Sequence, residues 1–239
     1  MEEWQLADKK NDEIKENFNS VKKQIAEAAQ RCGRNPDEIT LVAVSKKKSV
    51  DAIVKAIDVG VEILGENYIQ EAVNKIEVIH TKSPSWHFIG HLQSNKAKVA
   101  VKYFDLIHTV DSLKLAKEIN RHAEKAGKIQ DILIQINISQ EETKSGAAAE
   151  EGVKLAEAVS RLKFLSLKGV MGMPPFFDDP ERARPYLRRL ANIREAIKRE
   201  NIEKISMEHL SMGMSDDFRI AIEEGSTMVR IGTAIFGSR

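Results

Sequence analysis

Three consecutive lysines, Lys46 to Lys48, follow a short apolar run at 41–44 and the serine at 45. A lysine amine can attack a carbonyl carbon when burial or a neighbouring positive charge lowers its pKa. If Val42 and Val44 point to the interior of a barrel, strand alternation points Lys46 the same way. A nucleophilic Lys46 and a Lys46 that only pairs with Glu66 remain two open interpretations of the sequence.

The other two lysines have simpler interpretations. Alternation turns Lys47 away from the interior, and Lys48 precedes Ser49 and Asp51, which are typical of a helix start. We therefore expect both to be bystanders that at most lower the pKa of Lys46.

Two turns near the C-terminus, at 211–217 and 230–237, have the composition of a phosphate site. They carry hydroxyl groups and glycines, namely Ser211, Ser215, Thr233, Gly213 and Gly232. Small residues let backbone N–H groups approach an anion, and barrels often bind phosphate at the loops after strands 7 and 8. This interpretation requires Asp216 and Asp217 to point outward, and two ordinary tight turns are the alternative.

These features together suggest one cofactor. Pyridoxal 5′-phosphate carries an aldehyde, a pyridine nitrogen and a phosphate, and a lysine can capture the aldehyde as a Schiff base. Lys46, Arg230 and the two turns could meet these three groups.

The elements that must position these residues are eight short apolar runs. They lie at 40–46, 61–67, 86–90, 106–110, 132–139, 167–173, 205–213 and 227–237. Their lack of polar–apolar alternation is typical of parallel strands buried on both faces. Amphipathic stretches separate the runs, so the pattern predicts a (β/α)₈ barrel with its functional site at the carboxyl ends of the strands.

Helix signals support this arrangement. Before the first strand an apolar stripe predicts an additional N-terminal helix, with Ile14, Phe18, Val21, Ile25 and Ala28 on one face. Asp111 and Ser112 are suited to cap a helix that runs to about Lys125, and Ser215 is suited to cap another. A doubly wound open sheet is the competing fold, but the glycine-rich G-x-G-x-x-G and G-x-x-x-x-G-K-[ST] signatures are absent.

Composition excludes several classes of protein. The 239 residues include 37 basic and 36 acidic side chains, a net charge of +1, which argues against binding of nucleic acid or membrane through bulk positive charge. The single cysteine, Cys32, excludes an intrachain disulfide and a zinc site built on several thiolates. The charged N-terminus lacks the apolar core of a signal peptide, so we expect one soluble cytoplasmic domain over 1–239.

A series of motifs, in order, resembles the pyridoxal-phosphate homeostasis proteins, single-domain relatives of the alanine-racemase barrel. They are AVSK at 43–46, LGENY at 64–68, WHFIGHLQSNK at 86–96, HTVD at 108–111, QINIS at 135–139, KSG at 144–146, KGVMGMP at 168–174, LSMGMSDD at 210–217 and VRIGTAIFG at 229–237. The resemblance covers nearly the whole chain. It implies an alanine-racemase-like barrel that binds pyridoxal 5′-phosphate.

The resemblance also implies roles for individual residues. It places the Schiff base on Lys46, brings Asn67 to the cofactor and sets Arg230 beside the pyridine nitrogen. It implies that four residues surround the phosphate, namely Ser211, Ser215, Gly232 and Thr233, and Met171 is expected beside the ring. An arginine at the pyridine nitrogen keeps that nitrogen unprotonated, because two adjacent positive charges repel.

The function implied is binding of the cofactor and control of its free concentration and of amino and keto acids, without racemase activity. The chain has only three tyrosines, Tyr68, Tyr103 and Tyr186, and we expect no second domain after strand 8 that would supply the racemase tyrosine. We expect a monomer whose partners are the cofactor and pyridoxal-phosphate-dependent apo-enzymes, with no nucleic acid and no membrane. A weak amino-acid racemase is the alternative within this chemistry.

Two rivals come from other classes of enzyme. A metal-dependent barrel hydrolase would use histidines and a glutamate near strand ends, namely His87, His91, His108, Glu208 and His209, although the usual H-x-H pair is absent. A serine acyl-enzyme would use Ser45-x-x-Lys48 with Lys144-Ser145-Gly146, but alternation turns Ser45 toward the helices.

Overall fold

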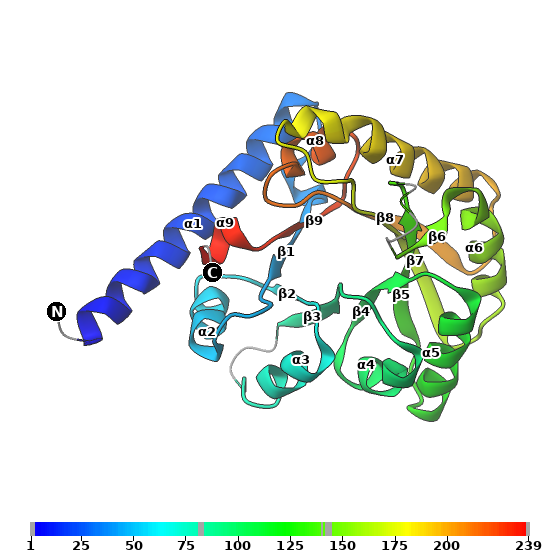
Figure 1. The fold of residues 1–239 in the computed structure, drawn as a ribbon, viewed down its shortest axis with the longest axis horizontal. Helices are drawn as coiled ribbons and strands as arrows, with labels where there is room; N and C mark the ends of the chain where they lie inside the picture. The colour runs from blue at the N-terminus through cyan, green and yellow to red at the C-terminus, as the bar shows by residue number, and fades with distance from the viewer. Residues whose placement is uncertain (1–2, 81–83, 140, 142–144, 238–239) are drawn as a thin grey trace.

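A closed barrel of eight parallel strands forms the centre of the molecule, with helices around it (Figure 1). This computed structural model describes residues 3–80, 84–139, 141 and 145–237. The barrel strands are β1 (Thr40–Val44), β2 (Ile63–Glu66), β3 (Ser85–Phe88), β4 (Leu106–Val110), β5 (Gln130–Asn137), β7 (Leu165–Met171), β8 (Ile205–Ser211) and β9 (Met228–Ile231). A two-residue strand, β6 (Ala147–Ala148), pairs beside β5. The ring closes because β1 pairs with both β2 and β9, which confirms the predicted (β/α)₈ barrel.

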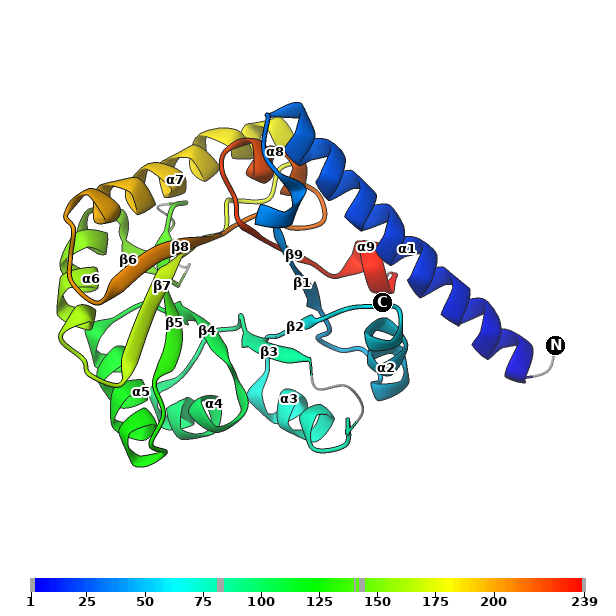
Figure 2. The same cartoon turned by 180° about the vertical axis from the view of Figure 1, so that it is seen from behind.

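Helices connect successive strands and cover the outside of the barrel (Figure 2). They are α1 (Glu3–Arg31), α2 (Val50–Asp58), α3 (Ile69–Ile76), α4 (Ala97–Tyr103), α5 (Leu113–Lys125), α6 (Gly152–Ser160), α7 (Arg184–Arg199), α8 (Phe218–Glu223) and α9 (Thr233–Phe236). Short 3₁₀ helices lie at Pro36–Glu38, Ser94–Lys96, Ala149–Glu151 and Pro180–Ala183. Within the described residues, every helix is too short or too polar to span a membrane.

The predicted helix caps are right at two positions and wrong at the third. The Ser49 side chain accepts a hydrogen bond from the Ala52 N–H, and Ser112 accepts one from the Leu115 N–H. Ser215 does not cap α8, which begins only at Phe218. The Asp217 carboxylate accepts from the Met214 N–H at 2.6 Å, and this bond folds the preceding residues into a turn.

The sheet has two apolar faces. Its outer face packs against the helices in one large cluster, which includes the predicted stripe of α1 from Ile14 to Ala28. Its inner face forms a small cluster within the barrel, made of Val42, Leu106, Leu133, Met171 and Met228. Val42 faces inward and Ala43 faces the helices, which confirms the alternation predicted for β1.

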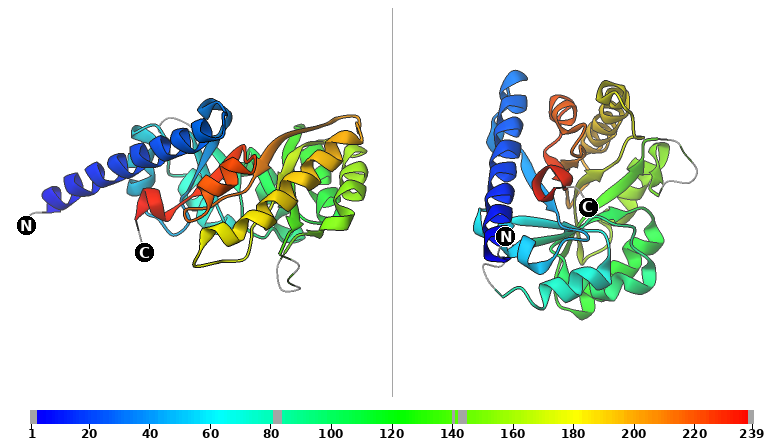
Figure 3. Two further views of the ribbon diagram at one scale, coloured as in Figure 1. Left: turned by 90° about the horizontal axis from the view of Figure 1, so that it is seen from above. Right: turned by 60° about the vertical axis from the view of Figure 1, so that its left-hand side comes forward.

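The long α1 holds the two ends of the chain together. It packs against α8 and α9, and its N-terminal end stands out beyond the barrel (Figure 3). The Asn17 amide donates to the Ile235 carbonyl at 3.2 Å. Just after the helix, the Arg34 guanidinium donates to the carbonyls of Ile222 and Ser226, each at 2.8 Å. These bonds attach α1 and the segment before β1 to α8, α9 and the residues that precede β9.

Candidate functional site

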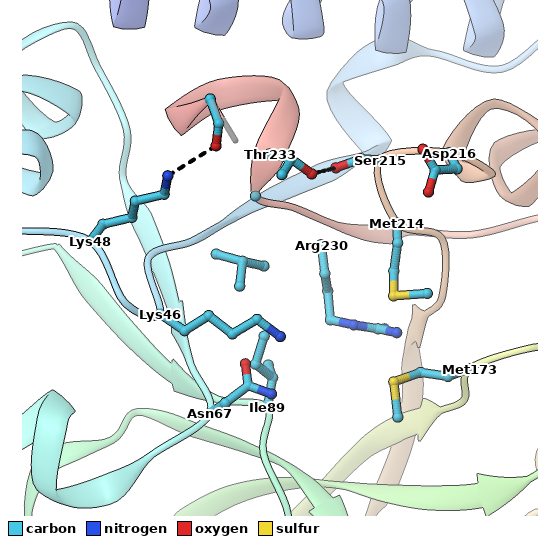
Figure 4. Close-up of a pocket in the computed structure, with 13 residues that line it drawn as sticks. Lys46, Lys48, Asn67, Ile89, Met173, Met214, Ser215, Asp216, Arg230 and Thr233 are labelled. Atoms are coloured by element: carbon cyan, nitrogen blue, oxygen red, sulfur yellow. Dashed lines mark hydrogen bonds between the residues drawn. The ribbon is translucent and has the colours of Figure 1, made fainter. Parts of the chain in front are cut away.

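A cavity of about 280 Å³ opens at the carboxyl ends of the strands (Figure 4). It is lined by Val44, Lys46, Lys48, Asn67, Ile89, Met173, Met214, Ser215, Asp216, Arg230, Gly232, Thr233 and Gly237. Six residues predicted from the sequence therefore meet there: Lys46, Asn67, Ser215, Arg230, Gly232 and Thr233. They come from the ends of β1, β2, β8 and β9, where a parallel barrel gathers its loops.

Lys46 is the second residue after the end of β1, and its side chain extends into this cavity (Figure 4). Its predicted alternative partner is engaged elsewhere, because the buried Glu66 accepts hydrogen bonds from Lys75 Nζ at 2.7 Å and from Ser45 Oγ at 2.6 Å. Both bonds lie on the helix-facing side of the strand, so Glu66 is not the group that holds Lys46.

A buried ion cluster supports the backbone on either side of Lys46. Lys75 Nζ donates to the Ser45 carbonyl at 2.8 Å, to Glu66 at 2.7 Å and to Glu71 at 2.6 Å. Glu71 also accepts the Lys47 backbone N–H. Burial is the largest influence on Glu66 and raises the pKa of its carboxyl, while the hydrogen bond from Lys75 lowers it. This cluster is nonlocal, and no sequence motif pointed to Lys75.

Arg230 brings a buried positive charge to the wall of the cavity. Its Nη1 donates to Ser211 Oγ at 2.7 Å and its Nη2 donates to the Gly172 carbonyl at 3.1 Å. Burial lowers the pKa of Arg230 to about 10, and the charge of Asp217 partly opposes this effect. The guanidinium is therefore still protonated at neutral pH.

The predicted phosphate turns meet at two hydroxyl groups. Thr233 Oγ1 donates to Ser215 Oγ at 3.2 Å across the cavity wall (Figure 4). A Cβ added at Gly232 would lie 3.3 Å from the Val44 carbonyl oxygen, so glycine suits the close packing of this turn. The phosphate interpretation requires both Asp216 and Asp217 to point outward. Asp216 is exposed, although it contributes to the cavity wall. The expectation is wrong for Asp217, which is buried because its carboxylate turns back to accept the Met214 N–H.

Lys48 also belongs to the cavity wall, although the sequence predicted a bystander. Its amine donates to the carbonyls of Phe236 at 3.1 Å and Gly237 at 2.9 Å, and so it caps the end of α9. The contact joins residues far apart in the sequence, so strand alternation could not reveal it. Lys47 is exposed, as predicted.

Two predicted residues lie deeper than the cavity wall. Met171 is fully buried in the small cluster within the barrel, and the side chain lining the cavity from that loop is Met173. Ser211 is also fully buried and reaches the cavity only through its bond to Arg230. Both side chains face the interior of the barrel, but they lie in the layer of side chains beneath the cavity.

A second cavity, of about 470 Å³, adjoins the first at the same end of the barrel. The two share Asn67, Ile89, Met173 and Met214 in their walls. The second reaches the exposed Phe176, which is 78% accessible. The mouth of the barrel is therefore open to solvent on this side.

The residues of the rival sites are dispersed. His87 and His108 are neighbours, but among the residues that the structure describes no three His, Cys, Asp or Glu side chains are arranged to hold a metal ion. Ser45 is buried behind the strand and donates to Glu66, and Lys144 lies outside the described residues.

Comparison with known proteins gives consistent matches. A family model described as alanine racemase, N-terminal domain, matches residues 12–239. The chain is similar to the pyridoxal phosphate homeostasis protein of Escherichia coli, at 44% identity over 230 residues, which cover 95% of this chain and 97% of the relative. It is also 42% identical over 230 residues to the protein of that name from Vibrio alginolyticus, again covering 95% and 97%.

A solved structure extends this similarity to three dimensions. The structure of PipY from Synechococcus elongatus, determined with pyridoxal phosphate (PLP) bound, superposes with a TM-score of 0.81 at 30% identity. The match covers 94% of this chain and 100% of that one, so the two chains share the barrel throughout.

Proposed function

The chain belongs to the alanine racemase N-terminal domain family and, within it, to the pyridoxal phosphate homeostasis proteins, and from this premise we propose that it binds pyridoxal 5′-phosphate as a Schiff base on Lys46. We propose further that it serves the homeostasis of this cofactor and of amino and keto acids. The observation that carries the proposal is the meeting of Lys46, Arg230, Ser215 and Thr233 at one cavity.

The residues around the cavity suit this cofactor. Among the described lining residues, Lys46, Lys48 and Arg230 are basic and only Asp216 is acidic, which favours an anionic ligand. The cavity lies near the lower end of the range of small-molecule sites, as a ligand with a single ring requires. Asn67 adds an amide to the cavity wall, and its buried Oδ1 has no hydrogen-bond partner among the residues that the structure describes.

Each lining group has a distinct task in this proposal. When bound, the cofactor supplies an aldehyde that condenses with a lysine amine with loss of water. Lys46 provides that amine, and the hydroxyls of Ser215 and Thr233 hold the phosphate. Arg230 can only donate hydrogen bonds, so it binds a ring nitrogen that carries no proton.

We propose a carrier rather than a racemase. Racemisation needs an acid and a base on opposite faces of the cofactor. The described lining of the cavity contains no tyrosine, cysteine or histidine. Tyr68 is 52% exposed at the start of α3, Tyr103 bonds to Glu77, and Tyr186 packs against Phe177. The open mouth of the barrel supports loading and release of the cofactor.

Reductive trapping tests attachment at Lys46. Borohydride treatment after incubation with pyridoxal phosphate should fix the cofactor on the peptide that contains Lys46, as identified by mass spectrometry. Lys46→Ala should lose both the label and the visible absorbance of the Schiff base, while the exposed Lys47→Ala keeps them. Absence of a label on wild-type protein, or a label that persists in Lys46→Ala on another lysine, would contradict the proposal.

A transfer experiment tests the carrier role. The loaded protein is mixed with an apo-enzyme that requires pyridoxal phosphate, and recovery of its activity is followed over time. We expect recovery faster than release of cofactor into buffer allows. Recovery limited by that release would remove the support for direct transfer to an enzyme. Exchange of the Cα hydrogen of amino acids in deuterated water would reveal the alternative, a weak racemase.

A further inference from the structure

A line of four buried polar side chains crosses the interior of the barrel and ends at the cavity. His87 Nδ1 on β3 lies 3.1 Å from His108 Nε2 on β4. His108 Nδ1 lies 3.0 Å from Ser211 Oγ on β8, and that oxygen lies 2.7 Å from Arg230 Nη1 on β9. All four are at most 5% exposed, so water does not compete for these bonds.

The direction of the hydrogen bonds follows from the chemistry of the groups. Arg230 has only donors, so Ser211 Oγ must accept from it. The hydroxyl hydrogen of Ser211 is then available for His108 Nδ1, the nearest acceptor on that side. His108 consequently carries its own hydrogen on Nε2 and donates it to His87 Nδ1. In this arrangement Ser211 makes one bond as acceptor and one as donor.

Arg230 is the only charged residue of this line, because both histidines and the Ser211 hydroxyl are neutral. Burial lowers the pKa of His87 to about 4 and lowers that of His108 well below its ordinary value, with further lowering of the latter by His87 and Arg230. Asp217 is the carboxylate whose charge reaches Arg230, and its Oδ1 is engaged by the Met214 N–H. Arg230 is thus held by the neutral oxygens of Ser211 and Gly172, and its charge remains available to a ligand.

We propose that His108 is a positioning residue for Arg230: by accepting the Ser211 hydroxyl hydrogen, it directs the Ser211 oxygen at the guanidinium and fixes the angle at which Arg230 faces the cavity. The inference rests on the proposed function, because the ligand group that Arg230 meets is the pyridine nitrogen. It assigns to His108, which does not reach the cavity, a part in selecting ligands with an unprotonated ring nitrogen.

The test compares two ligands that differ at one atom. These are pyridoxal 5′-phosphate and its analogue with C–H in place of the ring nitrogen. A hydrogen bond from a charged donor discriminates by about 10-fold or more, so wild-type protein should prefer the natural cofactor by that factor. His108→Phe should reduce the ratio of the two dissociation constants to within about 3-fold, because one bond to the charged donor is weakened.

A conservative variant separates positioning from packing. The Oδ1 atom of asparagine can stand close to the position of His108 Nδ1, so His108→Asn should restore most of the discrimination that His108→Phe loses. His122→Phe on α5, outside the barrel, is the matched control and should leave the ratio unchanged. Ser211→Ala removes the same connection from the other side and should behave as His108→Phe.

Direct observation of the histidine hydrogens completes the test and needs neither variant nor ligand. Nitrogen-15 NMR of the wild-type protein should show His108 with its hydrogen on Nε2. Hydrogen on Nδ1, or the same ligand ratio in wild type and in a folded His108→Phe, would overturn the inference. If wild type fails to bind pyridoxal phosphate, the proposed function fails, while the NMR result still decides how the line is arranged.

Discussion

At the scale of single residues, Lys75 matters to Lys46 although the two side chains lie on opposite sides of β1. All three hydrogens of the Lys75 ammonium are donated, to Ser45, Glu66 and Glu71. These bonds and the one from the Lys47 N–H to Glu71 fix the peptide groups on both sides of Lys46. Residues on the helix-facing side of β1 thus fix the backbone from which the Lys46 side chain enters the barrel.

Lys75→Met should destabilise the protein strongly. It leaves the buried Glu66 without its cation, and breaking a buried ion pair on one side costs about 3–5 kcal/mol. Chemical denaturation measures the loss. Lys23→Met is the control, because Lys23 and Glu27 form a pair with 78% and 48% exposed side chains, worth under about 1 kcal/mol. Equal losses of unfolding free energy in the two variants would show that the buried Lys75 cluster contributes no more to stability than an exposed ion pair.

The buried His87 should make stability depend on pH. Burial lowers its pKa from 6.5 to about 4 in the folded protein, so in this range the unfolded chain binds the additional proton. The stabilising contribution is complete above pH 6.5 and decreases as the pH falls toward 4, by about 3 kcal/mol in total. The difference in unfolding free energy between wild type and His87→Asn should therefore shrink across this window. A constant difference would show that His87 does not titrate there.

Sequence patterns predicted the direction of side chains better than their depth. Alternation along β1 placed Lys46 in the barrel because direction depends only on strand parity. The family resemblance brought Met171 and Ser211 to the cofactor, but a motif does not tell which layer of the barrel a residue occupies, and both lie below the cavity wall. Lys75 and the wall position of Lys48 depend on contacts between distant segments, which no local pattern encodes.

At the scale of elements, all eight strands were predictable because each is a short apolar run bounded by polar turns. The loop after β8 was not, since the pattern of residue types favours a helix capped by Ser215, whereas α8 begins only at Phe218. The residues between them form a turn in which Asp217 accepts the Met214 N–H, and residue types alone do not predict that contact.

The loops after β2 and β3 pack closely against each other, and this contact leads to a prediction. A Cβ added at Gly90, after β3, would lie 2.0 Å from the backbone oxygen of Asn67, after β2. Gly90→Ala must therefore displace Asn67, and we expect weaker binding of pyridoxal phosphate and destabilisation of about 1–3 kcal/mol. Fluorescence titration and denaturation measure the two effects.

Gly33→Ala is the matched control for this experiment. Gly33 has a φ of +72° but open space around its Cβ position. Its replacement should cost about 1 kcal/mol through backbone conformation alone and leave ligand binding unchanged. Unaltered binding in Gly90→Ala would show that the contact with Asn67 does not shape the cavity.

At the scale of the whole molecule, ligand binding should be visible as thermal stabilisation. A ligand at 100 times its dissociation constant stabilises by about 2.7 kcal/mol, which raises the Tm of a chain of this size by about 5–10 °C. Differential scanning calorimetry with pyridoxal phosphate should show this shift in wild type and a smaller one in Lys46→Ala. Inorganic phosphate alone should give only a small rise, and equal shifts with both ligands would argue against a specific site for the cofactor.

The pairing of β1 with β9 also constrains the order of events during synthesis of the protein. Lys46 leaves the ribosome long before Arg230, Gly232 and Thr233 do. A nascent chain therefore presents the amine long before it can form the hydroxyl-lined turn. Until β9 pairs with β1, the incomplete cavity offers an aldehyde no more than an ordinary lysine does, so capture of the cofactor would report that the barrel has closed.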